Sequence, residues 1–172
     1  MSKILLMSDS HGQIDLALEV MKKNKDVDAV LHAGDIEGDQ DRLRSATPHQ
    51  VAICRGNCDW GPGLPEQIIL PFGKRKIGLI HGHRYLRYGG ADSLAYWGME
   101  QGVDLVVFGH THVPYWEEVG KICLINPGSI SRPRQEGYEK TYGLLDLGDQ
   151  SLSVEIRRAQ DHKVLRREEH TF

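Results

Sequence analysis

KILLMSDSHG, residues 3–12, begins with an apolar run and passes directly into a polar loop. The apolar part, residues 4–7, is too short for a typical helix and is typical of a buried β-strand. The loop places Asp9, His11 and Gly12 immediately after the strand. The stretch therefore predicts a strand that delivers a carboxylate and an imidazole to one edge of a sheet.

The same pattern recurs four times along the chain. Apolar strands are predicted at residues 28–32, 51–54, 76–80 and 105–108, and each runs into a short loop that holds Gly with Asp, Asn or His. The five loops are Asp9-Ser10-His11-Gly12, Gly34-Asp35, Gly56-Asn57-Cys58-Asp59, His81-Gly82-His83 and Gly109-His110-Thr111-His112. Because ligand sites in α/β sheets gather at the carboxyl ends of strands, we expect these loops to converge.

The segments around these strands indicate the fold class. Helical spacing of apolar residues predicts amphipathic helices over residues 14–23 and 91–101. Further strands are expected at residues 67–70, 116–119, 122–125, 142–146 and 152–156, with a turn at 71–73. We therefore predict an α/β protein with one domain over residues 1–172. The early strands should form a mostly parallel or mixed sheet with helices outside, and the late strands a second sheet packed on it.

Composition excludes several classes of protein. The net charge of −3 and the pI near 6.3 argue against a dedicated nucleic-acid binder. No apolar run approaches the roughly 20 residues of a membrane span, and the N-terminus shows no signal peptide. The three cysteines lack CxxC spacing, so a cytoplasmic location without disulfides is expected. One basic stretch is interpreted as a solvated face mixed with Glu168 and Glu169: Arg157, Arg158, Lys163, Arg166 and Arg167.

Seven side chains in the five loops are good metal ligands: Asp9, His11, Asp35, Asn57, His81, His110 and His112. Imidazole, carboxylate and amide oxygen suit manganese, iron, zinc, nickel or cobalt rather than calcium or magnesium. Seven ligands exceed the three or four that one catalytic metal takes, so two metals that share a carboxylate fit the number. Two divalent ions would outweigh the charge of Asp9 and Asp35 and leave positive charge for a hydroxide and a phosphate oxygen.

In this order the motifs resemble the calcineurin-like metallophosphoesterase family. The short length, Cys58 and the later Asn126-Pro127-Gly128-Ser129 element are most similar to its small phosphodiesterases of the YfcE type. The resemblance implies a four-layer fold, a two-sheet β-sandwich flanked by helices. It also implies that one metal takes Asp9, His11 and His112 and that the other takes Asn57, His81 and His110. Asp35 would bridge the two, with a water or hydroxide as a second bridge.

The sequence departs from the wider family at one position. That family usually has His after the Gly-Asn pair, where it helps to stabilise or protonate the leaving oxygen, and here the residue is Cys58. A thiol is a weak hydrogen-bond donor and a poor acid, so modest turnover of esters with poor leaving groups is expected. His83 is a substitute acid if its side chain reaches the site. The catalytic residues predicted from the resemblance are Asp35, Asn57, Cys58 and His81.

Other polar side chains receive plainer interpretations. Arg55 and Arg84 are candidates for binding substrate oxygens. The remaining histidines, His32, His49, His162 and His170, are expected to be structural or solvent-facing, although His32 lies close enough to Asp35 to contact a ligand. Cys54 and Cys123 lie in apolar strands and are expected to be core thiols.

The expected function is metal-dependent hydrolysis of a small phosphate ester by a metal-bridging hydroxide, with manganese as the leading metal. A phosphodiester is the leading substrate, and a phosphomonoester stays open because the ligand set does not choose between them. The alternative from another class is a metal-binding scaffold related to the eukaryotic retromer subunit of similar fold, and the intact ligand set favours the hydrolase. A homodimer or homotetramer rests on resemblance alone; Tyr115, Trp116 and Tyr138 form its interface or else cover the core.

Overall fold

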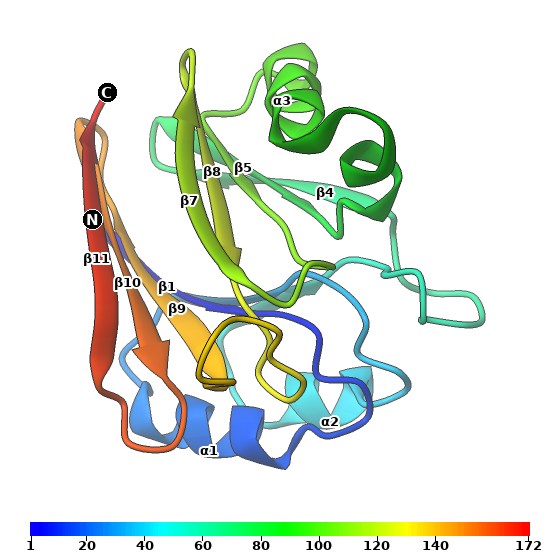
Figure 1. The fold of residues 1–172 in the computed structure, drawn as a ribbon. Coiled ribbons are helices and arrows are strands. Elements are labelled where there is room, and N and C mark those ends of the chain that lie inside the picture. The colour runs from blue at the N-terminus through cyan, green and yellow to red at the C-terminus, as the bar shows by residue number, and fades with distance from the viewer.

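The computed structural model describes residues 1–172 as two β-sheets packed face to face with helices on their outer faces (Figure 1). The strands are β1 (Ser2–Met7), β2 (Ala29–His32), β3 (Gln50–Ile53), β4 (Gln67–Phe72), β5 (Arg75–Ile80), β6 (Leu105–Val107), β7 (Pro114–Val119), β8 (Ile122–Pro127), β9 (Thr141–Leu147), β10 (Ser151–Arg158) and β11 (Val164–Thr171). The helices are α1 (Asp15–Lys23), α2 (Gln40–Ser45) and α3 (His83–Gln101).

The first sheet has six strands in the order β11-β10-β9-β1-β2-β3. β1, β2 and β3 are parallel, while β9 joins the other edge of β1 in antiparallel pairing. Parallel neighbours need crossover connections, which the segments containing α1 and α2 supply. The carboxyl ends of the three parallel strands therefore lie at one edge of the sheet.

The second sheet has five strands in the order β4-β5-β6-β8-β7. Its three central strands are parallel, and β4 and β7 are antiparallel strands at the two edges. α3 connects β5 to β6 across the outer face of this sheet (Figure 1). The ends of β5 and β6 thus bring two further loops toward those of the first sheet.

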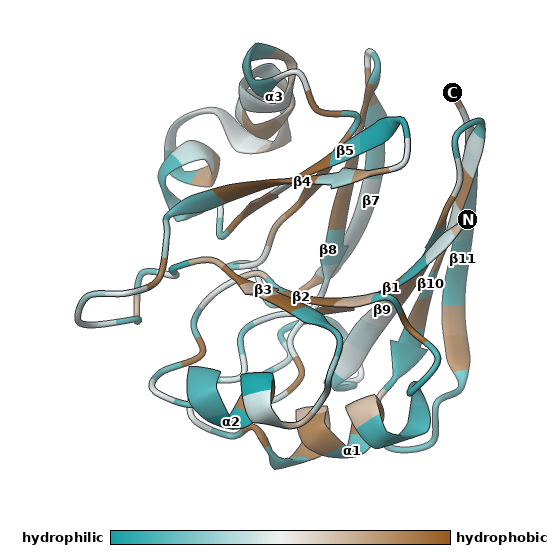
Figure 2. Ribbon diagram, turned by 180° about the vertical axis from the view of Figure 1, so that it is seen from behind, coloured by the Kyte–Doolittle hydropathy of each residue, from teal (hydrophilic) through white to brown (hydrophobic).

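Side chains of the central strands alternate between two cores. In β1, Ile4 and Leu6 lie in the core between the sheets, whereas Leu5 and Met7 belong to the core beneath α1. All four are fully buried, and each such side chain stabilises the fold by about 1.5–3 kcal/mol. Burial of both faces explains why these strands read as continuous apolar runs, which Figure 2 shows as hydrophobic colour within the strands.

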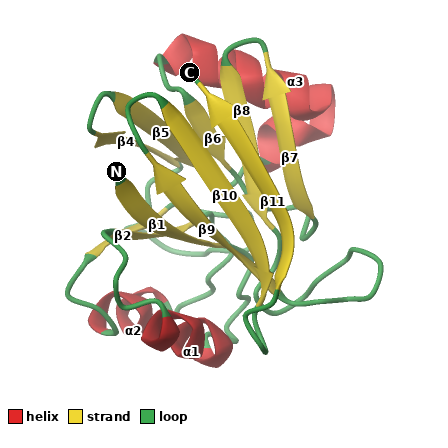
Figure 3. Cartoon of the chain, turned by 90° about the vertical axis from the view of Figure 1, so that its left-hand side faces the viewer, coloured by secondary structure: helices red, strands yellow, loops and turns green.

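Helices cover both outer faces, as Figure 3 shows. α1 and α2 pack on the first sheet through a cluster that includes Val20 and Leu43. α3 packs on the second sheet through Leu94 and Trp97. The order of layers is helix, sheet, sheet, helix, which confirms the predicted fold class. No helix of the structure is both long enough and apolar enough to span a bilayer.

The predicted division of strands between the sheets was wrong. β7 and β8 join β4, β5 and β6 in the second sheet, whereas β9, β10 and β11 extend the first sheet beyond β1. The physical reason lies in β1, whose second edge needs hydrogen-bond partners because the strand is buried on both faces. β9 supplies these partners together with buried Leu144 and Leu145.

Several local predictions also differ from the structure. α3 begins at His83 rather than Ala91, because Gly90 (φ 62°, ψ −152°) kinks a longer helix whose second half is the predicted one. β4 continues through Pro71 and Phe72, so the turn falls at residues 73–74 instead of 71–73. α2 and β11 were not predicted. α2 has only six residues, and β11 is an edge strand of mostly exposed charged side chains.

The basic stretch near the C-terminus lies on β10, β11 and the turn between them, where its arginines are paired. Arg157 and Arg167 both contact Glu155, and Arg166 pairs with Glu168. Arg158 pairs with Glu139 and Asp161. Mixed charge on a sheet face agrees with the predicted solvated surface.

Cys54, Cys123 and most of the aromatic residues discussed above pack into the cores. Cys54 and Cys123 are buried free thiols. Trp116 packs against the core between the sheets, and Tyr115 packs against the core beneath α3. Tyr138 is exposed, whereas Tyr115 and Trp116 are partly buried.

Candidate metal centre

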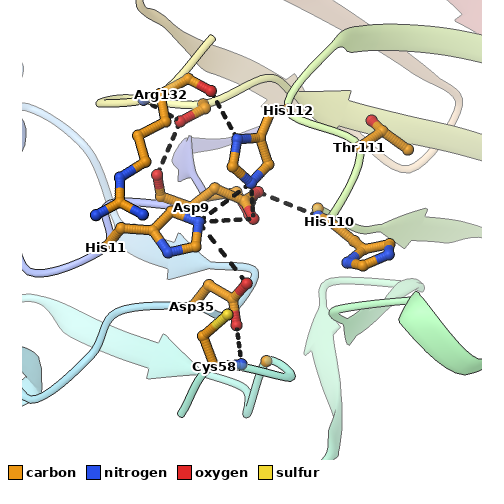
Figure 4. A network of polar contacts seen from close by, with 12 residues as sticks. Asp9, His11, Asp35, Cys58, His110, Thr111, His112 and Arg132 are labelled. Atoms are coloured by element: carbon orange, nitrogen blue, oxygen red, sulfur yellow. Dashed lines mark hydrogen bonds and ion pairs between the residues drawn. The ribbon is translucent and has the colours of Figure 1, made fainter. Parts of the chain in front are cut away.

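The five predicted loops converge where the two sheets meet. Asp9 and His11 follow β1, Asp35 follows β2 and Asn57 follows β3. His81 follows β5, and His110 and His112 follow β6. Backbone hydrogen bonds join the loops in pairs, from Asp9 N–H to the Gly34 carbonyl and from Gly109 N–H to the His81 carbonyl. Figure 4 shows Asp9, His11, Asp35 and His112 pointing toward one another.

Asp9, His11 and His112 form the first set of close polar atoms. The Nε2 atoms of His11 and His112 are 3.1 Å apart, and Asp9 Oδ1 lies 3.2 Å from His112 Nε2. Asp9 Oδ1 is buried and accepts no hydrogen bond. An unpaired buried carboxylate oxygen is costly, so this atom needs a positively charged partner.

Hydrogen bonds on the far side of each ring orient these histidines. His11 Nδ1–H donates to Glu37 over 2.8 Å, and His112 Nδ1–H donates to the Arg132 carbonyl over 2.6 Å. In the neutral rings both Nε2 atoms then carry lone pairs, and these face each other beside Asp9. Two lone pairs that face each other repel unless a cation lies between them. Hydrogen bonds from the outer nitrogen of each ring thus orient the imidazoles for a metal.

Asn57, His81 and His110 form the second set. Asn57 Oδ1 lies 3.0 Å from His81 Nε2 and 2.9 Å from His110 Nδ1. His81 Nδ1–H donates to the Ala33 carbonyl over 2.7 Å, which again directs Nε2 inward. His81 is fully buried, whereas His110 is half-buried and Asn57 is exposed. The second set therefore forms the open side of the centre.

Asp35 lies between the two sets. Its Oδ2 is 3.8 Å from His11 Nε2 and 3.3 Å from His81 Nε2, while Oδ1 accepts a hydrogen bond from Cys58 N–H. One carboxylate oxygen thus faces an imidazole of each set. The donor atoms fit the pair of divalent ions that the resemblance implies, with Asp35 in the place of a shared ligand.

The backbone at the centre is strained. Five of the seven candidate ligands have positive φ between 47° and 69°: Asp9, His11, Asp35, His110 and His112. Residues other than glycine rarely adopt this left-handed backbone conformation, which costs on the order of 1–3 kcal/mol per residue. Strain of this kind persists where the surroundings enforce it and is concentrated at functional sites.

Two glycines allow the loops to approach closely. A Cβ on Gly56 would lie 2.0 Å from Asp35 Oδ1, and one on Gly109 would lie 2.0 Å from Ser8 Oγ and 2.8 Å from Asp9 Oδ2. Any larger residue would displace a candidate ligand. These glycines are therefore required by contact with the carboxylates rather than by turn geometry.

Asp59 fastens the two loops on either side of Asp35. Its carboxylate accepts hydrogen bonds from four backbone N–H groups, those of Asp35, Ile36, Glu37 and Gly56. The sequence alone did not predict this role for Asp59. The available signal was its position two residues after Asn57, where a carboxylate can cap the backbone amides of a turn.

Three serines support Asp9 and were also missed. Ser8 Oγ donates to Asp9 Oδ2, and Ser129 and Ser131 both donate to the Asp9 carbonyl. Ser129 belongs to the element at residues 126–129 that the sequence analysis had noted only for its resemblance. That element therefore holds the first loop in place from the second half of the chain.

Electrostatics at the centre favour negative carboxylates and a charged His81. Burial raises the pKa of Asp9 and Asp35. The nearby rings of His112 and His81 outweigh burial at Asp9, and His81 with the Cys58 N–H outweighs it at Asp35, so both pKa values lie below the usual range. Burial lowers the pKa of His81, but Asp35 and Asp9 outweigh it and raise that pKa. A bound metal would displace the His81 proton, so metal binding should weaken in acid.

One candidate proton donor, Cys58, lies between the two sets, and the other, His83, lies beside the second set. The Cys58 Sγ lies within 4.8 Å of ligand atoms of His11 and Glu37, and the His83 ring centroid is 6.0 Å from that of His110. Burial and the charge of Asp35 raise the pKa of Cys58 to about 11. Burial and the charge of His81 lower the pKa of His83, so neither side chain is a strong acid at neutral pH.

The remaining polar candidates have partners of their own. Arg84 forms two hydrogen bonds to Glu66, and Arg55 donates to the Gly61 carbonyl. His32 is buried behind the centre between Ser10 and Gly34. The other three histidines lie away from the centre: His49 contacts Lys25, His162 contacts Tyr142 and His170 contacts Glu118.

Comparison with known sequences matches residues 2–150 to the calcineurin-like phosphoesterase superfamily domain. The chain is 32% identical over 152 residues to the probable metallophosphoesterase YsnB of Bacillus subtilis (strain 168), covering 88% of each protein. It is 34% identical over 127 residues to the phosphodiesterase YfcE of Escherichia coli (strain K12), covering 63% of each.

Solved structures share the fold over nearly the whole chain. A protein of Streptococcus pneumoniae TIGR4 described as a predicted phosphoesterase has a TM-score of 0.87 at 32% identity, covering 99% of this chain and 98% of that one. Vps29 of Entamoeba histolytica, solved in complex with zinc, has a TM-score of 0.78 at 25% identity, covering 98% of both chains.

Proposed function

The chain belongs to the calcineurin-like phosphoesterase superfamily, and from this premise we propose that it is a dinuclear-metal phosphodiesterase. One metal would be held by Asp9, His11 and His112, and the other by Asn57, His81 and His110: two sets that share Asp35. Manganese is the leading metal, since imidazole and carboxylate ligands without thiolate suit it and cell availability decides among similar ions.

The observation that carries the proposal is the position of Asp35 Oδ2. It lies 3.8 Å from an imidazole nitrogen of one set and 3.3 Å from an imidazole nitrogen of the other. A single-metal site would not need a carboxylate between two complete sets of ligands. The two ions, when bound, supply Lewis-acid activation of water and offset the negative charge of the phosphate.

The chain's own residues determine how the ester is oriented. The second set is open to solvent at Asn57, so the phosphate approaches from that side. Asp9, His11 and His112 of the first set are buried. Because neither Cys58 nor His83 is a strong acid at neutral pH, the leaving oxygen departs with little proton donation, and good leaving groups are preferred.

A protein-interaction scaffold is the second candidate, favoured by the similarity to Vps29. That similarity extends over the same length of chain as the similarity to the Streptococcus pneumoniae protein. The fold alone therefore does not decide, and a measurement of turnover is required.

Hydrolysis of bis(p-nitrophenyl) phosphate and of p-nitrophenyl phosphate tests the proposal. Metal-stripped protein should be inactive, and added Mn²⁺ should restore cleavage of the diester more than of the monoester. Asp35→Asn should lower the restored rate by at least about 100-fold, since a neutral amide cannot hold two cations together. Asp26→Asn, which changes an exposed carboxylate paired with Lys3 outside both sets, should retain the activity within a few-fold. A folded protein that cleaves neither ester with any divalent metal would support the scaffold.

A further inference from the structure

Two hollows meet at the open side of the metal centre. One has a volume of about 280 Å³ and the other about 530 Å³. Both are lined by Asn57, His83 and Arg84, so they form the two arms of one groove, with Asn57 of the second set at the junction. His110 also lines the larger arm. A phosphate held at the centre therefore has space on two sides.

Each arm contains one aromatic side chain with almost no packing partners. Trp60 lines the smaller arm and is 92% exposed, whereas Tyr88 lines the larger arm and is 82% exposed. The other two tryptophans of the chain pack into cores. Scattered exposed aromatic residues are ordinary, but here one stands in each arm of the groove.

Arginine side chains lie close to the segments that carry the two rings. Arg55 donates to the carbonyl of Gly61, which anchors the projecting loop between β3 and β4 that carries Trp60 (Figure 1). The Arg87 guanidinium lies 5.4 Å from the centroid of the Tyr88 ring. Arg84 is held by Glu66 at the junction. The groove is thus lined by guanidinium groups and aromatic rings, which together bind nucleotides in many proteins.

Resting on the proposed phosphodiesterase function, we propose that the substrate is a small phosphodiester carrying a nucleobase-like ring on each side of phosphorus, as in a dinucleotide. One ring stacks on Trp60 and the other on Tyr88. A monoester would fill only one arm. The net charge of −3 favours a small diester over a long nucleic acid, which would need a basic surface.

Two chromogenic diesters with the same leaving group test the assignment: p-nitrophenyl thymidine 5′-phosphate and p-nitrophenyl methyl phosphate. The Mn²⁺-loaded wild type should prefer the thymidine ester. Of Trp60→Ala and Tyr88→Ala, one should lower kcat/KM about tenfold for the thymidine ester alone, and the other should lower it for both esters through loss of the p-nitrophenyl contact. Trp60→Phe and Tyr88→Phe should restore most of the loss. Tyr96→Ala removes an exposed tyrosine of α3 that lines neither arm and should change nothing.

Binding without turnover separates this proposal from the proposed function. Thymidylyl-thymidine should quench the fluorescence of the exposed Trp60, and Tyr88→Ala should raise the Kd of this dinucleotide about tenfold. If both alanine variants cleave both esters with the same kcat/KM as the wild type, the groove assignment is overturned and the hydrolase stays intact. Dinucleotide binding that Tyr88→Ala weakens, without cleavage of any ester, would support the groove and contradict the hydrolase. Absence of binding would overturn the groove.

Discussion

Cys58 stands next to Asn57, where the resemblance to the wider family leads us to expect a histidine. Burial and the neighbouring carboxylate of Asp35 raise its pKa to about 11, so the thiol stays protonated at neutral pH and is a weak acid. Its backbone N–H has a separate task, because it donates to Asp35 Oδ1. The side chain can therefore be exchanged without removing the bond that orients Asp35.

Cys58→His should make the turnover rate less dependent on the pKa of the leaving group. An imidazole at this position donates a proton far more readily than the thiol, and general acid catalysis contributes about 100-fold or more. We expect turnover of alkyl diesters to rise by roughly that factor, with little change for p-nitrophenyl esters, in a series graded by leaving-group pKa. Cys58→Ser is the control without an imidazole and should behave as the wild type. An unchanged dependence in Cys58→His would show that no acid acts from this position.

His32 is a buried histidine whose protonation bears on stability. The ring is fully buried, and this burial lowers the pKa of His32 to about 4. The Gly34 N–H donates to its Nδ1. A histidine with a lowered pKa in the folded state stabilises the protein above its unfolded pKa of 6.5. That stability is lost as the pH falls from 6.5 toward 4, because the unfolded chain then binds the proton more readily.

Urea unfolding of metal-free protein measures this effect. Between about pH 7.5 and pH 5, the His32 contribution to the free energy of unfolding should fall by about 2 kcal/mol. His32→Asn keeps an acceptor for the Gly34 N–H but cannot be protonated, so its stability should fall less over the same range. The comparison with this variant is essential because the lowered pKa values of His83 and His110 act in the same direction. Equal losses in both proteins would contradict the role of His32.

At the scale of elements, the loops after the strands depend on one carboxylate. Asp59 accepts four backbone hydrogen bonds and ties residues 35–37 to Gly56. The loop after β2 contains Asp35 and Glu37, both with positive φ, and such strained backbone needs external support. Asp59 thus holds the shared carboxylate at its position without contacting a metal.

Asp59→Asn should weaken metal binding. An amide offers one acceptor oxygen, so at least two of the four N–H groups lose their partner, which costs about 3 kcal/mol of stability. By calorimetric titration, Mn²⁺ affinity should fall about 10- to 100-fold. Asp149→Asn is the matched control, since Asp149 also accepts a backbone N–H, from Lys74, at the far end of the sheets. Wild-type Mn²⁺ affinity in Asp59→Asn would contradict the positioning role.

The strands and loops differ in how far the sequence could predict them. Apolar runs such as residues 4–7 predicted the central strands because burial on both faces leaves no other pattern. The loops after them could be expected to meet because parallel strands end at one edge of a sheet. β11 escaped prediction because its exposed side chains show no alternation, and the start of α3 escaped because Gly89 and Gly90 interrupt the helical pattern.

At the scale of the whole molecule, strand pairing joins distant segments. β9 pairs with β1 across more than half of the chain, and Ser129 reaches back to the Asp9 carbonyl. Such pairings depend on contacts that no local pattern contains, which is why the predicted division into early and late sheets was wrong. The candidate ligands were identified by residue type, but the supporting contacts of Asp59 and the serines required the folded arrangement.

The central claim is that both sheets together hold two metal ions on either side of Asp35. Anomalous diffraction from crystals grown with Mn²⁺ tests it most directly. We predict two peaks about 3.5–4 Å apart, one against Asp9, His11 and His112 and the other against Asn57, His81 and His110. Asp35→Asn crystals should lose at least one peak. A single ion, or two ions bound elsewhere in the wild type, would contradict the account.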